Sequence, residues 1–227
     1  MNDLKRNLKQ ELKQEKNGME LTKKELKEKT EIMLQESGKG IAQVAAEASF
    51  KIWEEKNFRE MINFNNIPRT EADRIFNELE LTALGLFILH LDFVLLKTVD
   101  EAKQIVFKGL RENIRRGFIE IFKDLCLEEM YLEQWRGLVD MRLREYRKDY
   151  KIALKQIKNV QDFENNGAIK IIWARVETLT IDSLTHIRMG NVTKGDPLWR
   201  YLRRWLTELD VSFGKITSTL LGPLAQA

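Results

Sequence analysis

The sequence feature that most constrains the fold is an almost unbroken apolar run from Leu81 to Leu96. As an α-helix, a run of this length reaches about 24 Å, which is shorter than the roughly 30 Å core of a bilayer. The run also contains two ionisable residues, His90 and Asp92. We therefore expect a helix that is buried inside the protein and does not span a membrane.

The residues around this run repeat with the period of a helix. One side forms a coiled-coil-like seam with alternating steps of four and three residues, made of Ile75, Leu79, Thr82, Leu86, Leu89, Phe93 and Leu96. The opposite side is apolar as well, with Leu84, Phe87, Leu91, Val94 and Leu95. Because a helix that is apolar all round must be surrounded by protein, the segment near 71–97 is predicted to be the central helix of a bundle.

The rest of the chain is also predicted to be helical. Almost no segment alternates apolar and polar residues as a half-buried strand would, so the predicted fold class is all-α. N-cap signals and two predicted breaks, at residues 17–18 and 37–40, divide the chain into about seven to eight helices. The candidate N-cap residues are Thr22, Thr70, Thr98 and Asp196. Together these signals predict a multi-helix bundle around the helix near 71–97.

The first 36 residues differ from the rest in composition. They contain nine Lys or Arg residues, eight acidic residues and no aromatic residue. Their apolar stripe is thin, with Leu4, Leu8 and Leu12 in its first part, and a helix this weakly amphipathic is marginal alone. We therefore predict an amphipathic helical arm at 1–36, mobile or docked on a partner, and a single globular domain at 37–227. The stripe favours a homodimer formed through the N-terminal helices.

Composition limits the possible sites and partners. The chain has 38 Lys and Arg residues against 35 acids, so any surface for an anionic partner must be local. The single Cys126, in an apolar context, is predicted to pack in the core. With two His residues, one Cys and no phosphate-, zinc- or di-iron-binding motif, we predict no cofactor and no metal site. The N-terminus lacks the apolar segment of a secretory signal, which predicts a cytoplasmic protein.

His90 and Asp92 are the most suggestive polar pair because they lie in the most apolar helix. Two residues apart, their side chains point about 200° from one another and cannot bind one ion together. Each therefore needs its own partner from another helix. They are either a buried His and a buried Asp that are hydrogen-bonded or paired with a cation, or one of them lines an internal ligand pocket.

A second candidate is a polar stripe on the predicted helix at 168–189. Arg175, Asp182 and His186 share one face, and Asp182 lies one turn before His186. A carboxylate in that position can hold the imidazole, as carboxylates do in acid–base and metal sites. The sequence identifies no third group. A solvated face or a ladder of interhelical hydrogen bonds also explains the stripe.

A third candidate is a row of cations along one side of the predicted helix at 127–158. From Arg136 to Lys158 the cations outnumber the acids by eight to three. Such a row is either a surface for the phosphates of a nucleic acid or a solvated helix face. Its members are Arg144, Arg147, Lys148, Lys151, Lys155 and Lys158.

Three functions remain open. The one with most support is a helical protein–protein interaction or assembly protein, because charged amphipathic helices occur here without catalytic motifs. The second is a nucleic-acid-associated protein that uses the row of cations. The third is a small-molecule binder or an enzyme with an interior pocket near His90 or Asp92. The absence of catalytic motifs favours a protein that is not an enzyme.

Overall fold

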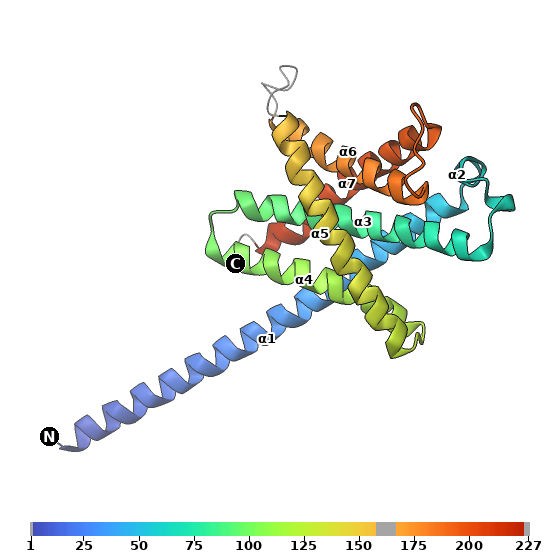
Figure 1. Ribbon diagram of the computed structural model, residues 1–227. Helices are drawn as coiled ribbons and strands as arrows, with labels where there is room; N and C mark the ends of the chain where they lie inside the picture. Colours follow the sequence, from blue (N-terminus) through green and yellow to red (C-terminus); the bar gives the residue numbers. More distant parts are fainter. Residues whose placement is uncertain (1, 158–166, 225–227) are drawn as a thin grey trace.

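The computed structural model describes residues 2–157 and 167–224 (Figure 1). In this part of the chain there are seven α-helices, one short 3-10 helix and no strand, which confirms the all-α prediction. The elements are α1 (Asn2–Glu54), α2 (Lys56–Met61), the 3-10 helix η1 (Phe64–Asn66), α3 (Arg69–Lys97), α4 (Glu101–Asp124), α5 (Glu129–Ile157), α6 (Gly167–Ile187) and α7 (Pro197–Leu224).

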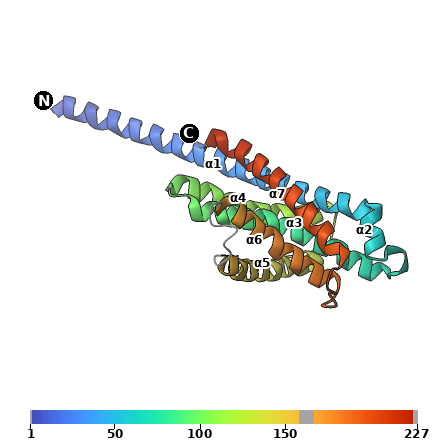
Figure 2. The ribbon, with the colours of Figure 1, turned by 90° about the horizontal axis from the view of Figure 1, so that it is seen from above.

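α3 is the central helix of the bundle, as predicted. It contacts α1, α4, α5, α6 and α7, and Figure 2 shows α1 and α5 on opposite sides of it. Every residue from Glu78 to Leu89 is buried. The last turn departs from the expectation, because Leu96 is 81% exposed. By length and composition α3 could also cross a membrane, but 67% of its most apolar window is buried inside the protein.

α1 is one continuous helix, so the breaks predicted at 17–18 and 37–40 are wrong. A glycine costs a helix only about 1 kcal/mol, which good helix formers on either side outweigh. Gly38 also has a packing role, because a Cβ at this position would approach the backbone of Asn113 in α4 to 2.5 Å. The glycine that predicted a helix end therefore marks the place where α1 and α4 cross closely.

The two halves of α1 have different surroundings. The first half extends away from the other helices in both views (Figures 1 and 2), and the second half packs along α4 and α3. Packing is already present at Leu34, which is 9% exposed and lies against Gly109 of α4. The side chains of Leu4, Leu8 and Leu12 lie outside the described residues, so the homodimer stays a prediction.

The predicted N-cap residues are confirmed in one case. The side chain of Asp196 accepts a hydrogen bond from the backbone N–H of Leu198 at the start of α7. Asp100, and not Thr98, caps α4, because the Thr98 hydroxyl donates to the Val94 carbonyl at the end of α3. The other two candidates, Thr22 and Thr70, lie within α1 and α3.

Cys126 is exposed, contrary to the prediction that it packs in the core. It lies in the turn between α4 and α5, with a left-handed backbone φ of 61°. Its apolar sequence neighbours suggested burial, but Leu125 beside it is 67% exposed as well. The turn therefore projects from the bundle and takes the thiol out of the core.

Candidate functional site

A groove with an apolar floor lies between α3, α4 and α5. Its volume is about 440 Å³, within the range of small-molecule sites. The floor comes from the last turns of α3 and the facing side of α5, with Leu89, Phe93, Leu95, Leu96 and Leu154. It exists because α3 stays largely apolar up to Leu96, whereas neighbouring helices bury every residue only as far as Leu89.

Four cations and one carboxylate line the same groove. Asp92 of α3 accepts a hydrogen bond of 2.7 Å from Arg111 of α4 and one of 2.6 Å from Arg147 of α5. Lys108 and Lys151 also line the groove, and within the described part of the chain neither forms an ion pair. Four positive charges against one negative charge leave a net charge of +3. We call this site the cationic groove.

The electrostatics of the cationic groove favour an anionic ligand. Each guanidinium carries five N–H donors, and the single bond to Asp92 leaves others on Arg111 and Arg147 available. The planar donors of arginine match the oxygens of carboxylates and phosphates. Both arginine side chains are only about one-third exposed, so salt screens their charges less than it screens fully exposed ones. The groove can therefore hold an anionic head beside an apolar body.

His90 lies outside the cationic groove and is half-buried beside the buried side chains of Arg175 of α6 and Asp210 of α7. Arginine can only donate, so Nη2 of Arg175 donates to Nδ1 of His90 at 3.2 Å. Burial works against the charged form of Asp210, yet the neighbouring His90 and Arg175 outweigh it and hold the pKa of Asp210 below its ordinary value. His90 and Asp92 thus have separate partners, and Asp92 is the one that lines the cationic groove.

The polar stripe of α6 is divided among different partners. Arg175 pairs with Asp210, and Nε2 of His186 lies 3.1 Å from a carboxylate oxygen of Glu145 in α5. Glu145 therefore takes the role that the sequence suggested for Asp182, because α5 packs against α6 here. Asp182 lies in another groove, between α5 and α6. Burial, followed by the charges of acids such as Asp149, raises the pKa of Asp182 to about 7.

The row of cations on α5 is split by the fold. Arg147 forms an ion pair with Asp92, whereas four other members of the row are exposed, namely Arg144, Lys148, Lys151 and Lys155. Lys158 lies outside the described residues. The structure therefore joins two members of the row, Arg147 and Lys151, with Asp92 in one site. The nucleic-acid hypothesis rests on the exposed members and stays a prediction.

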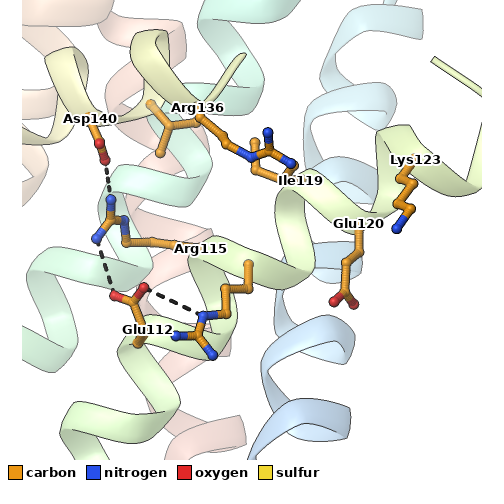
Figure 3. A pocket seen from close by; sticks show the side chains of 9 residues that line it. Glu112, Arg115, Ile119, Glu120, Lys123, Arg136 and Asp140 are labelled. Carbon is orange, nitrogen blue, oxygen red and sulfur yellow. Dashed lines mark hydrogen bonds and ion pairs between the residues drawn. The ribbon is translucent and has the colours of Figure 1, made fainter. Parts of the chain in front are cut away.

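A further pocket, of about 350 Å³, lies between α4 and α5 (Figure 3). Arg115 lies between Asp140 and Glu112 and pairs with both, and Arg116 also pairs with Glu112. Arg136 pairs with acids of its own helix. Because most of its charges are paired with one another, this pocket attracts a charged ligand less than the cationic groove does.

Comparison with known proteins adds no functional information. No protein-family model, curated protein or solved structure matches this chain. Within residues 2–157 and 167–224, no group of three or more His, Cys, Asp or Glu side chains could hold a metal ion. The geometry of the grooves is therefore the evidence on function.

Sequence reasoning missed Lys108 and Arg111, which the structure places in the cationic groove. A signal for them existed, because Gln104, Lys108 and Arg111 follow one another at steps of four and three residues. That spacing puts them on one face of α4. What the spacing could not show is that this face meets Asp92.

Proposed function

We propose that this protein binds an amphipathic anion, a carboxylate or phosphate head on an alkyl body, in the cationic groove. The observation that carries the proposal is the cluster of Asp92, Arg111 and Arg147 directly beside the apolar side chains of Leu89 and Phe93. The groove keeps an excess of positive charge next to apolar surface.

The two parts of the groove suit the two parts of such a ligand. An anionic head can pair with Lys108 and Lys151 and accept N–H bonds from the arginines. An alkyl body can cover Phe93 and Leu154, and burying apolar surface contributes about 25 cal/mol per Å². The lining residues are cations, apolar side chains and a carboxylate already paired by two arginines, which suits binding rather than catalysis.

Calorimetric titration with octanoate and octyl phosphate tests this function. We expect both to bind the full-length protein. The variant Lys108→Gln/Lys151→Gln should bind at least tenfold more weakly, because the two unpaired charges are lost. Lys148→Gln/Lys155→Gln is the matched control, since both lysines are exposed on α5 and neither lines the groove. No binding to the unmodified protein, or an equal loss in the control, contradicts the proposal.

A second function, assembly of two copies through the first half of α1, is favoured by a different observation. That half of α1 extends away from the body in both views (Figures 1 and 2). A weakly amphipathic helix is marginal alone and gains stability from a partner surface. The nine cations and eight acids of residues 1–36 nearly cancel, so two copies can lie together without net repulsion.

Light scattering of the full-length chain tests the assembly function. We expect a dimer that becomes a monomer in the variant Leu8→Glu/Leu12→Glu, with unchanged circular dichroism of the body. Val211→Glu is the control, because it places the same kind of side chain on α7 at a residue that is 51% exposed. A monomer at high concentration of the unmodified chain would remove the assembly function.

A further inference from the structure

A second groove lies between α5 and α6 and uses the opposite side of α5. The cationic groove is lined by Arg147, Lys151 and Leu154, whereas the second groove is lined by Asp149, Ile152 and Gln156, which point roughly 140–180° away from Arg147. Its volume is about 660 Å³, also within the range of small-molecule sites. α5 thus separates two grooves, and the charges that line them have opposite signs.

A buried hydroxyl without a partner lines this second groove. Thr178 of α6 is 5% exposed, and its Oγ1 makes no hydrogen bond within the described part of the chain. The neighbouring Thr180 behaves differently, because its hydroxyl donates to the carbonyl of Val176 at 2.7 Å. A buried polar group left unpaired costs about 1–3 kcal/mol, so such a group needs an explanation. A bound ligand that donates a hydrogen bond provides one.

Three carboxylates line the same groove, from Asp149, Glu177 and Asp182. Glu177 is partly neutralised by Arg203 of α7, whose Nε lies 3.5 Å from Oε2. Asp149 and Asp182 form no ion pair among the residues that the structure describes, and Oδ2 of Asp182 is buried without a hydrogen-bond partner. The groove therefore offers unpaired acceptors and a net negative charge.

The remaining wall of the groove is apolar, with Ile152, Trp173 and Ile181. An aromatic face beside carboxylates attracts cations as well as apolar groups. A ligand for this site thus needs a cationic head that donates hydrogen bonds and a body that covers apolar surface.

We propose that the groove between α5 and α6, lined by Asp149, Thr178 and Asp182, binds a protonated organic amine with an apolar body. The ammonium N–H groups donate to the Asp182 carboxylate and to the Thr178 oxygen. The body lies against Ile152, Trp173 and Ile181. This site does not depend on the cationic groove, because no residue lines both.

Two probes of equal chain length test the proposal, namely octylamine and octanol, with octylamine titrated below its micelle concentration and octanol below its solubility limit. Octylamine is expected to bind the full-length protein at least tenfold more tightly than octanol. Its binding should shift the isoleucine methyl NMR signals of Ile152 and Ile181. Equal affinity for octylamine and octanol, or no binding of octylamine, overturns the proposal.

Two variants of the groove keep the test independent of folding defects. Thr178→Val removes a buried hydroxyl that lacks a partner, and Asp182→Asn removes the charge of a half-buried carboxylate that has no ion-pair partner, so both variants should fold and melt at the same temperature as the unmodified protein or higher. Both should lose at least tenfold in affinity for octylamine. Asp73→Asn, an exposed change of the same kind on α3, is the control and should lose nothing. Unchanged octylamine affinity in Asp182→Asn overturns the proposal, whatever the melting temperature.

Discussion

The guanidinium of Arg175 and the carboxylate of Asp210 form a buried ion pair that joins α6 to α7. Both side chains are at most 3% exposed, and the nitrogen–oxygen distances lie between 2.7 and 2.9 Å. The same guanidinium donates to His90 of α3, whose ring packs edge-on against Phe213. One polar cluster therefore connects three helices inside the core.

Replacing Arg175 by Met should destabilise the protein strongly, because Asp210 would remain buried without its cation. Breaking a buried pair from one side costs about 3–5 kcal/mol. The double variant Arg175→Met/Asp210→Leu should recover most of that loss, because both charges are removed together. Urea unfolding of the three proteins measures the differences in the free energy of unfolding.

The control for this prediction is the exposed pair between Arg204 and Glu208 on α7. Exposed pairs contribute little, so Arg204→Met should leave the free energy of unfolding nearly unchanged. If Arg175→Met cost no more than Arg204→Met, the buried pair would not be what holds α6 to α7.

Alanine substitution should have opposite effects on stability at two helical glycines, Gly117 at the crossing of α1 and α4 and Gly137 on α5, away from that crossing. A Cβ at Gly117 would meet the backbone of Lys39 at 2.6 Å, whereas a Cβ at Gly137 of α5 would meet nothing within 4 Å. Gly117→Ala should therefore destabilise the protein by about 1–3 kcal/mol through overpacking. Gly137→Ala should stabilise it by about 0.5–1 kcal/mol through helix propensity.

Thermal unfolding of these two alanine variants measures the signs directly. A stabilised Gly117→Ala variant would mean that α1 and α4 do not approach each other closely at this crossing. A destabilised Gly137→Ala variant would mean that a Cβ at this position does meet neighbouring atoms.

The features of the fold that were predictable from sequence are those that depend on one helix at a time. The apolar surroundings of Leu81–Leu96 identified the central helix, and Asp196 before Pro197 identified the start of α7. Gly38 was misinterpreted because local propensity counts a glycine as a breaker, whereas its contact with Asn113 comes from another helix. Tertiary packing overrides propensity at such positions.

In the candidate site, too, the features of a single helix were predictable and the contacts between helices were not. Asp92, Arg147 and Lys151 were singled out separately, because burial and charge spacing are visible along one helix. Their meeting in one groove depends on how α3, α4 and α5 pack, which no local pattern encodes. The groove on the other side of α5 was missed for the same reason, since its residues lie on two helices and Asp182 was assigned to His186.

Two buried glutamates of α3 lie two residues apart and have different surroundings. Glu78 accepts hydrogen bonds from Arg142 and Tyr146. Glu80 is 6% exposed, and its Oε2 has no hydrogen-bond partner among the described residues. Burial raises the pKa of Glu80 from an ordinary 4.5 to about 8. The folded protein therefore holds this proton more tightly than the unfolded chain does.

The sign of the pH dependence follows from the pKa of Glu80. Between about 4.5 and about 8 the folded state binds more protons than the unfolded state, so the contribution of Glu80 to stability falls as pH rises and levels off above about 8. Glu80→Gln should remove this fall. The variant should be more stable than the unmodified protein at pH 8.5 by a few kcal/mol, because one pKa unit corresponds to about 1.4 kcal/mol, and the difference should shrink toward pH 4.5.

Glu78→Gln should instead destabilise the protein at neutral pH by weakening the contact of this side chain with Arg142. Urea unfolding across this pH range checks both variants, and a Glu80→Gln profile parallel to that of the unmodified protein would refute the assignment.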